Sequence, residues 1–124
     1  MLRADEILLT NAKGVALMGE IQTLAAKQNL YFRSAEVKDD RYFSSTWQLL
    51  NEYGVAPRDY IVLTLSLCFI TKQMYLSHKC FQNYHIDYRA ADTMKPVDID
   101  PDSDTLAADI CEWFSECLQR FKGR

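Results

Sequence analysis

The apolar run "YIVLTLSLCFIT", residues 60–71, constrains the fold more than any other stretch of the chain. Its 12 residues fall short of the roughly 20 that a membrane-spanning helix needs, so we expect it in a protein core. Its apolar residues alternate with Thr64 and Ser66, as in a strand, but residues 57–84 show no turn signal that would send the chain back. We therefore predict a central buried helix there, with a strand as the alternative for residues 61–70.

The first segment, residues 4–28, also has a helical pattern. Apolar or small residues recur along one stripe: Ile7, Gly14, Leu17, Ile21 and Leu24. Gly14 and Gly19 each cost a helix about 1 kcal/mol relative to alanine. We expect them to mark the close approach of another helix.

A further helix is predicted over residues 39–53. Large apolar residues follow one another at spacings of 4, 3 and 3: Phe43, Trp47, Leu50 and Tyr53. Gly54 suits the left-handed position after a helix, and Pro57 prevents its continuation. Residues 28–34, "QNLYFRS", are expected to form an apolar connector between the first two helices.

The last helix is predicted over residues 104–122. Asp102, Ser103 and Asp104 precede it and suit its N-terminus, where side-chain oxygens and negative charge are favourable. One face is apolar, and Asp109, Glu112 and Glu116 form a separate acidic stripe.

These patterns together predict an all-α protein, a single-domain bundle of about four helices covering residues 1–124. Only four glycines and three prolines interrupt the chain, and no Asn-Gly or Asp-Gly pair is present to close a tight hairpin. The four cysteines lie within apolar patterns and the N-terminus does not resemble a signal peptide, so we expect a cytoplasmic protein with reduced thiols.

Charge is unevenly distributed along the chain. The net charge is −3, but residues 87–117 contain nine acids against two bases. Residues 98–109, "DIDPDSDTLAAD", approach the ligand spacing of a calcium-binding EF-hand loop. Ser103 replaces its central glycine and Asp109 its final glutamate, so calcium binding is an alternative hypothesis only.

Signals for catalysis are weak. We find no nucleophile elbow, no phosphate-binding glycine loop and no His-Glu-x-x-His motif. The histidines and cysteines lack the Cys-x2-4-Cys spacing of structural zinc sites. We therefore predict no enzymatic activity, no metal site and no cofactor.

The remaining interpretation is a non-enzymatic protein-binding module of the inhibitor, immunity, anti-defence or secretion-adaptor type. An acidic and aromatic surface would bind a partner protein with a basic surface, without nucleic acid or membrane. Its predicted residues are Asp98, Asp100, Asp109, Glu112, Glu116, Tyr75, Phe81, Tyr84 and Tyr88. A homo-oligomeric subunit, for example a homodimer formed through the apolar helix of residues 57–84, is a further alternative.

Overall fold

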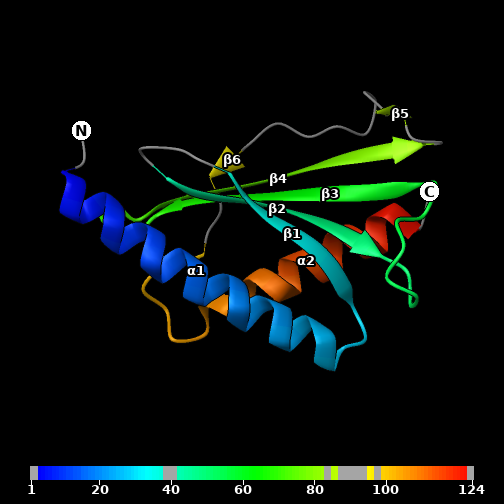
Figure 1. The fold of residues 1–124 in the computed structure, drawn as a ribbon, viewed down its shortest axis with the longest axis horizontal. Coiled ribbons are helices and arrows are strands. Elements are labelled where there is room, and N and C mark those ends of the chain that lie inside the picture. The colour runs from blue at the N-terminus through cyan, green and yellow to red at the C-terminus, as the bar shows by residue number, and fades with distance from the viewer. Residues whose placement is uncertain (1–2, 38–41, 83–84, 87–94, 97–98, 123–124) are drawn as a thin grey trace.

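The computed structural model describes residues 3–37, 42–82, 85–86, 95–96 and 99–122 (Figure 1). Its elements are α1 (Ala4–Lys27), β1 (Tyr31–Val37), β2 (Phe43–Leu50), β3 (Tyr60–Cys68), β4 (Gln73–Gln82), β5 (His85–Ile86), β6 (Lys95–Pro96) and α2 (Leu106–Lys122). The protein is thus an α/β fold, and the prediction of an all-α bundle of four helices is wrong. None of the described helices is long and apolar enough to cross a membrane.

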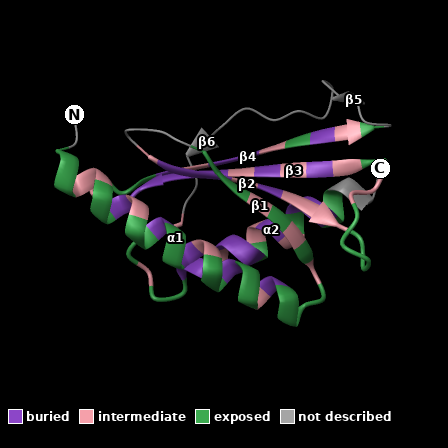
Figure 2. Cartoon of the chain, in the orientation of Figure 1, coloured by how far each residue is buried: buried purple, intermediate pink, exposed green. Residues whose placement is uncertain are grey.

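The four long strands form an antiparallel meander in the order β1-β2-β3-β4, with the two-residue strands β5 and β6 both paired to β4. In its register Trp47 lies opposite Leu63, which lies opposite His78. Both helices lie on the same side of the sheet (Figure 1). The core therefore forms between one sheet face and the two helices, and Figure 2 shows the buried positions along that boundary.

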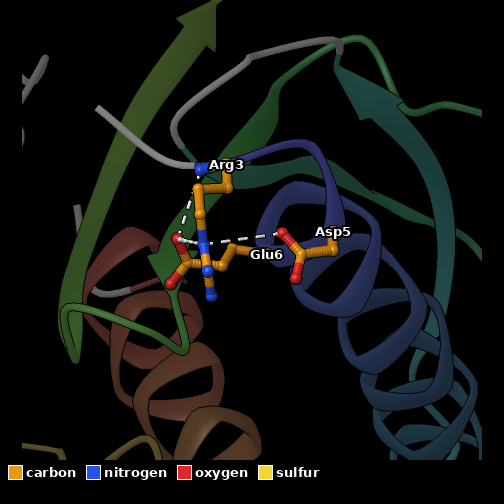
Figure 3. A network of polar contacts seen from close by, with 3 residues as sticks. All are labelled: Arg3, Asp5 and Glu6. Atoms are coloured by element: carbon orange, nitrogen blue, oxygen red, sulfur yellow. Dashed lines mark hydrogen bonds and ion pairs between the residues drawn. The ribbon is translucent and has the colours of Figure 1, made fainter.

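The first helix was predicted correctly. Arg3 precedes it, and the Glu6 carboxylate accepts hydrogen bonds from the Arg3 backbone N–H and from its Nε, both at 3.2 Å (Figure 3). Asp5 adds a weaker ion pair to the same guanidinium at 3.7 Å. At the other end, Asn29 takes a left-handed φ of 61° and the Leu30 N–H bonds to the Ala25 carbonyl, so the helix ends there.

The predicted central helix over residues 57–84 is instead the hairpin of β3 and β4. Ile61, Leu63, Leu65 and Leu67 all point to the core, as strict alternation requires. The chain turns at residues 69–72, where Lys72 supplies a left-handed φ of 60° without a glycine. The alternating pattern was therefore the correct signal, and the missing turn motif was misleading.

The predicted helix over residues 39–53 is also wrong, because residues 43–50 form β2. Phe43, Ser45 and Trp47 face the core on alternate positions. Ser45 is a polar residue at a core position, and its Oγ accepts a hydrogen bond of 2.8 Å from the Trp47 indole N–H. This serine interrupts the apolar alternation, while Leu50 on the opposite face imitates a helical spacing.

Gly14 meets the ring of Phe43 rather than a second helix. A Cβ added at Gly14 would lie 2.1 Å from Phe43 Cγ, so only glycine lets α1 pack this closely on β2. Gly19 differs, since nothing lies within 4 Å of a Cβ added there.

The last helix was predicted within two residues of its observed start. Ser103 stabilises that start, because its Oγ accepts the Thr105 N–H at 3.2 Å and its carbonyl accepts the Leu106 N–H. The apolar side of α2 packs on the sheet, where Phe114 and Trp47 have ring centroids 5.6 Å apart.

Candidate protein-binding surface

The outer sheet face, defined here as the side of β1–β4 that points away from both helices, is not covered by any described helix. Residues directly opposite one another in paired strands share a face, so the register identifies its members. They are Tyr31, Arg33, Ala35, Val37, Ser44, Thr46, Gln48, Leu50, Tyr60, Val62, Thr64, Ser66, Cys68, Gln73, Tyr75, Ser77, Lys79 and Phe81. Antiparallel sheets commonly leave one face open in this way.

The middle of the outer sheet face consists of small residues, most of which carry a hydroxyl group. One row across the strands is Ala35, Thr46, Thr64 and Ser77. Beside it, Ser44 and Ser66 are buried and their hydroxyl groups bond to each other at 2.8 Å. Ser77 is buried as well, and Thr46 and Thr64 are half-buried, so this strip itself offers little accessible surface and a partner would contact the larger residues around it.

Aromatic residues border this strip at one end. Tyr75 is half-buried and contacts Tyr42 edge to face, with ring centroids 5.9 Å apart. Tyr42 also donates a hydrogen bond of 3.1 Å to Gln73 Oε1. Tyr42 therefore links Tyr75 and Gln73 at this end of the strip.

A second aromatic pair borders the strip at the opposite end. Tyr60 and Phe81 stack across β3 and β4 with centroids 4.6 Å apart and planes only 10° from parallel. Leu50 is half-buried on the same side and Tyr31 is exposed. Partly exposed aromatic side chains of this kind serve as anchors in protein interfaces.

The two charged residues at outward positions of the four long strands are both cations. Arg33 and Lys79 are exposed and lie in one row with Gln48 and Val62 between them. No carboxylate occupies an outward strand position among the residues that define the face. The outer sheet face is therefore locally basic in a protein whose net charge is negative.

The predicted acidic stripe exists but lies in the other layer. Asp109, Glu112 and Glu116 lie on the side of α2 that does not enter the core, and Glu112 and Glu116 are exposed. Tyr75 and Phe81, by contrast, lie on the outer sheet face. The structure therefore separates the acidic residues from these aromatic residues instead of joining them in one surface.

Three other predicted binding residues, Tyr84, Tyr88 and Asp98, lie outside the described residues. Among the residues that the sequence interpretation missed are Arg33, Tyr60 and Lys79. These residues share a face only because residues 57–84 form two strands. The pairing of β1 with β2, β2 with β3 and β3 with β4 then places Arg33 and Lys79 in one row across the sheet.

The acidic residues of the candidate calcium loop bind different partners and do not converge on one point. The Asp100 carboxylate accepts the Asp102 backbone N–H at 2.9 Å, whereas Asp102 pairs with Lys72 of the β3–β4 turn. Asp109 accepts a hydrogen bond from the Thr105 hydroxyl at 3.1 Å. Within the described part of the chain, no three His, Cys, Asp or Glu side chains are placed to hold a metal ion.

The four cysteines are buried thiols, and they do not offer an accessible nucleophile. Burial raises the pKa of the Cys68 thiol, but hydrogen bonds from Thr71, Ile70 and Thr10 lower that pKa more, so it lies below its usual value. Cys68 is only 1% exposed, which keeps a substrate away from its sulfur. A depression of about 320 Å³ between α1 and the start of α2 is lined by Lys13, Ala16, Leu17, Glu20, Phe69, Ser103, Asp104 and Leu106, without cysteine or histidine.

Comparisons with known proteins add no family to these observations. A scan against protein-family models and searches of curated proteins and of solved structures found no match to this chain.

Proposed function

We propose that this chain is a non-enzymatic protein-binding module that binds a partner protein on its outer sheet face. The observation that carries the proposal is the combination, on a sheet face that no described helix covers, of the stacked pair Tyr60 and Phe81 with the cations Arg33 and Lys79. Aromatic residues supply contact area, and the two cations favour an acidic partner surface.

The free edge of the sheet extends this surface. Among the described strands, β1 pairs only with β2, so one side of its seven residues is open. An unpaired strand edge can accept an extended segment through backbone hydrogen bonds. A partner that contributes such a segment would contact Arg33 and Tyr31 from β1 at the same time.

A second candidate surface is the acidic stripe of α2. Glu112 and Glu116 are exposed and Asp109 lies beside them, which favours a partner with a basic surface. Because α2 lies in the layer opposite the outer sheet face, one experiment can separate the two candidates.

The test is a pull-down from the source cell's lysate with three forms of the full chain. They are the wild type, the double variant Arg33→Glu and Lys79→Glu, and a variant in which Asp109, Glu112 and Glu116 are each changed to Lys. All the substituted side chains are wholly or partly exposed, so the variants should fold, which circular dichroism can check. Arg120→Glu, an exposed single charge reversal on α2, serves as the control.

We expect a protein partner that the wild type, the α2 variant and Arg120→Glu retain and that the sheet variant loses. Retention should also weaken as salt is added, because exposed charges are screened. If only the α2 variant loses the partner, the binding site is the acidic stripe and not the outer sheet face. Retention of nucleic acid in place of protein, or of nothing, would refute the proposal.

A further inference from the structure

Three large apolar side chains of α1 are exposed, beside small and polar residues on the same helix. Leu8, Leu9 and Val15 are 69%, 47% and 55% exposed. The helix is fixed to the core by its opposite side, through Thr10, Gly14, Leu17, Ile21 and Ala25. Figure 2 shows exposed positions recurring along the length of α1. Contiguous exposed apolar residues mark an interaction surface.

Six exposed residues of α1 follow the spacing of a two-helix coiled coil. They are Leu9, Ala12, Ala16, Gly19, Thr23 and Ala26, which alternate three and four residues apart. We call these six residues the α1 seam. At about 100° per residue, the α1 seam lies on the side of the helix opposite its buried stripe. It is therefore exposed where α1 does not pack on the core.

No packing contact in the described part of the chain requires glycine at position 19. Gly19 lies in the interior of a helix, where glycine costs about 1 kcal/mol relative to alanine, and no atom lies within 4 Å of a Cβ added there. A groove of about 540 Å³ runs beside it, lined by Ala16, Gly19, Glu20, Thr23 and Leu24. Glycine and alanine at such positions allow a neighbouring helix to approach closely.

A row of alternating charges flanks the α1 seam. Glu6, Lys13, Glu20 and Lys27 are spaced seven residues apart and therefore lie on one side of the helix. When a second α1 lies antiparallel, Lys13 of each copy faces Glu20 of the other, and Glu6 faces Lys27. All four contacts then join opposite charges. In a parallel pair the row would instead face Leu8 and Val15 on the other flank.

We propose that α1 binds a second copy of this chain, antiparallel, across the α1 seam. The two-fold axis passes between Ala16 and Gly19, so Ala16 of each copy packs near Gly19 of the other. The seam of 18 residues is about 27 Å long, enough for five turns of contact. This contact is independent of the proposed function, because the outer sheet face lies on the opposite side of the molecule (Figure 1).

The test uses two single charge reversals, Lys13→Glu and Glu20→Lys, and the mass of the chain in solution. Sedimentation equilibrium of the wild type, at concentrations up to about 1 mM, should show a transition from 14.4 kDa to twice that mass. Each reversal places like charges together at both symmetric contacts, so we expect dimerisation to weaken about tenfold. Mixing the two variants in equal amounts should restore it. In the mixed dimer the introduced glutamate of one copy faces the introduced lysine of the other, and the native Lys13 and Glu20 face each other at the second contact.

Two controls complete the design. Gly19→Arg places a long charged side chain at the two-fold axis and should keep the chain at 14.4 kDa, whereas Glu112→Lys on α2 should dimerise like the wild type. A wild type that stays monomeric at every concentration would overturn the proposal. A dimer that forms equally well in all the variants would also overturn it, because the contact would then lie elsewhere.

Discussion

Replacing Gly14 by alanine is the sharpest test of how α1 packs on the sheet. Three ring carbons of Phe43 lie 2.1, 2.3 and 2.5 Å from the position of the new Cβ, closer than any carbon contact allows. Phe43 is fully buried, so its ring cannot move aside freely. Overpacking at such a position costs about 3 kcal/mol, and alanine returns about 1 kcal/mol through its higher helix propensity. We expect a net loss of about 2 kcal/mol, or about 8 °C in Tm.

Gly19→Ala is the matched control, because it adds the same methyl group to the same helix in open space. It should gain up to about 1 kcal/mol. Urea unfolding of both variants, followed by circular dichroism at low protein concentration, measures the difference. Phe43→Leu in the Gly14→Ala background should recover part of the loss, with a coupling of about 1 kcal/mol. Equal stabilities of the two glycine variants would refute the packing argument.

Three further changes test single contacts. Ser45→Ala leaves the buried Trp47 indole N–H without its acceptor and should cost about 1–3 kcal/mol in urea unfolding; a neutral result would show that the indole finds another acceptor. The hydrogen bond from the Arg3 backbone N–H lowers the pKa of Glu6 from 4.5, so the Glu6 contribution to stability is present above pH 4.5 and lost as pH falls through the lower folded value. Glu6→Gln should abolish the part of the fall in Tm at acidic pH that comes from protonation of Glu6. If Tm falls with pH in the same way in this variant as in the wild type, the hydrogen bond from Arg3 to Glu6 does not stabilise the protein. Burial raises the pKa of Cys111 above 9.0, so its contribution is complete below pH 9 and decreases above it, as only the unfolded thiol ionises. Cys111→Ala should therefore lose less stability than the wild type between pH 8 and pH 10, and parallel profiles would contradict this assignment.

The helices were the predictable part of this fold. Both α1 and α2 have capping residues within a few positions of their ends and an apolar stripe at helical spacing, and these are local signals. The core residues Ile61, Leu63, Leu65 and Leu67 were also identified from their letters alone, although they were assigned to the wrong element.

The sheet could not be predicted from local signals, for reasons that particular residues make clear. Ser45 occupies a core position because Trp47 from the same strand satisfies it, and no sequence rule expects a serine there. Lys72 makes the β3–β4 turn in a left-handed conformation that lysine rarely adopts, so the usual glycine signal is missing. Because residues 57–84 were predicted as one helix, the members of the outer sheet face could not be identified from the sequence.

The ends of the two helices, the apolar core positions of residues 61–67 and the acidic character of residues 87–117 could all be predicted from the sequence, because these properties depend on neighbours along the chain. Three relations became visible only in the folded chain: Gly14 packs against the Phe43 ring, Arg33 and Lys79 share one sheet face, and the acidic stripe of α2 lies in the other layer. Those relations depend on strand register, and register is set by contacts between residues distant in sequence.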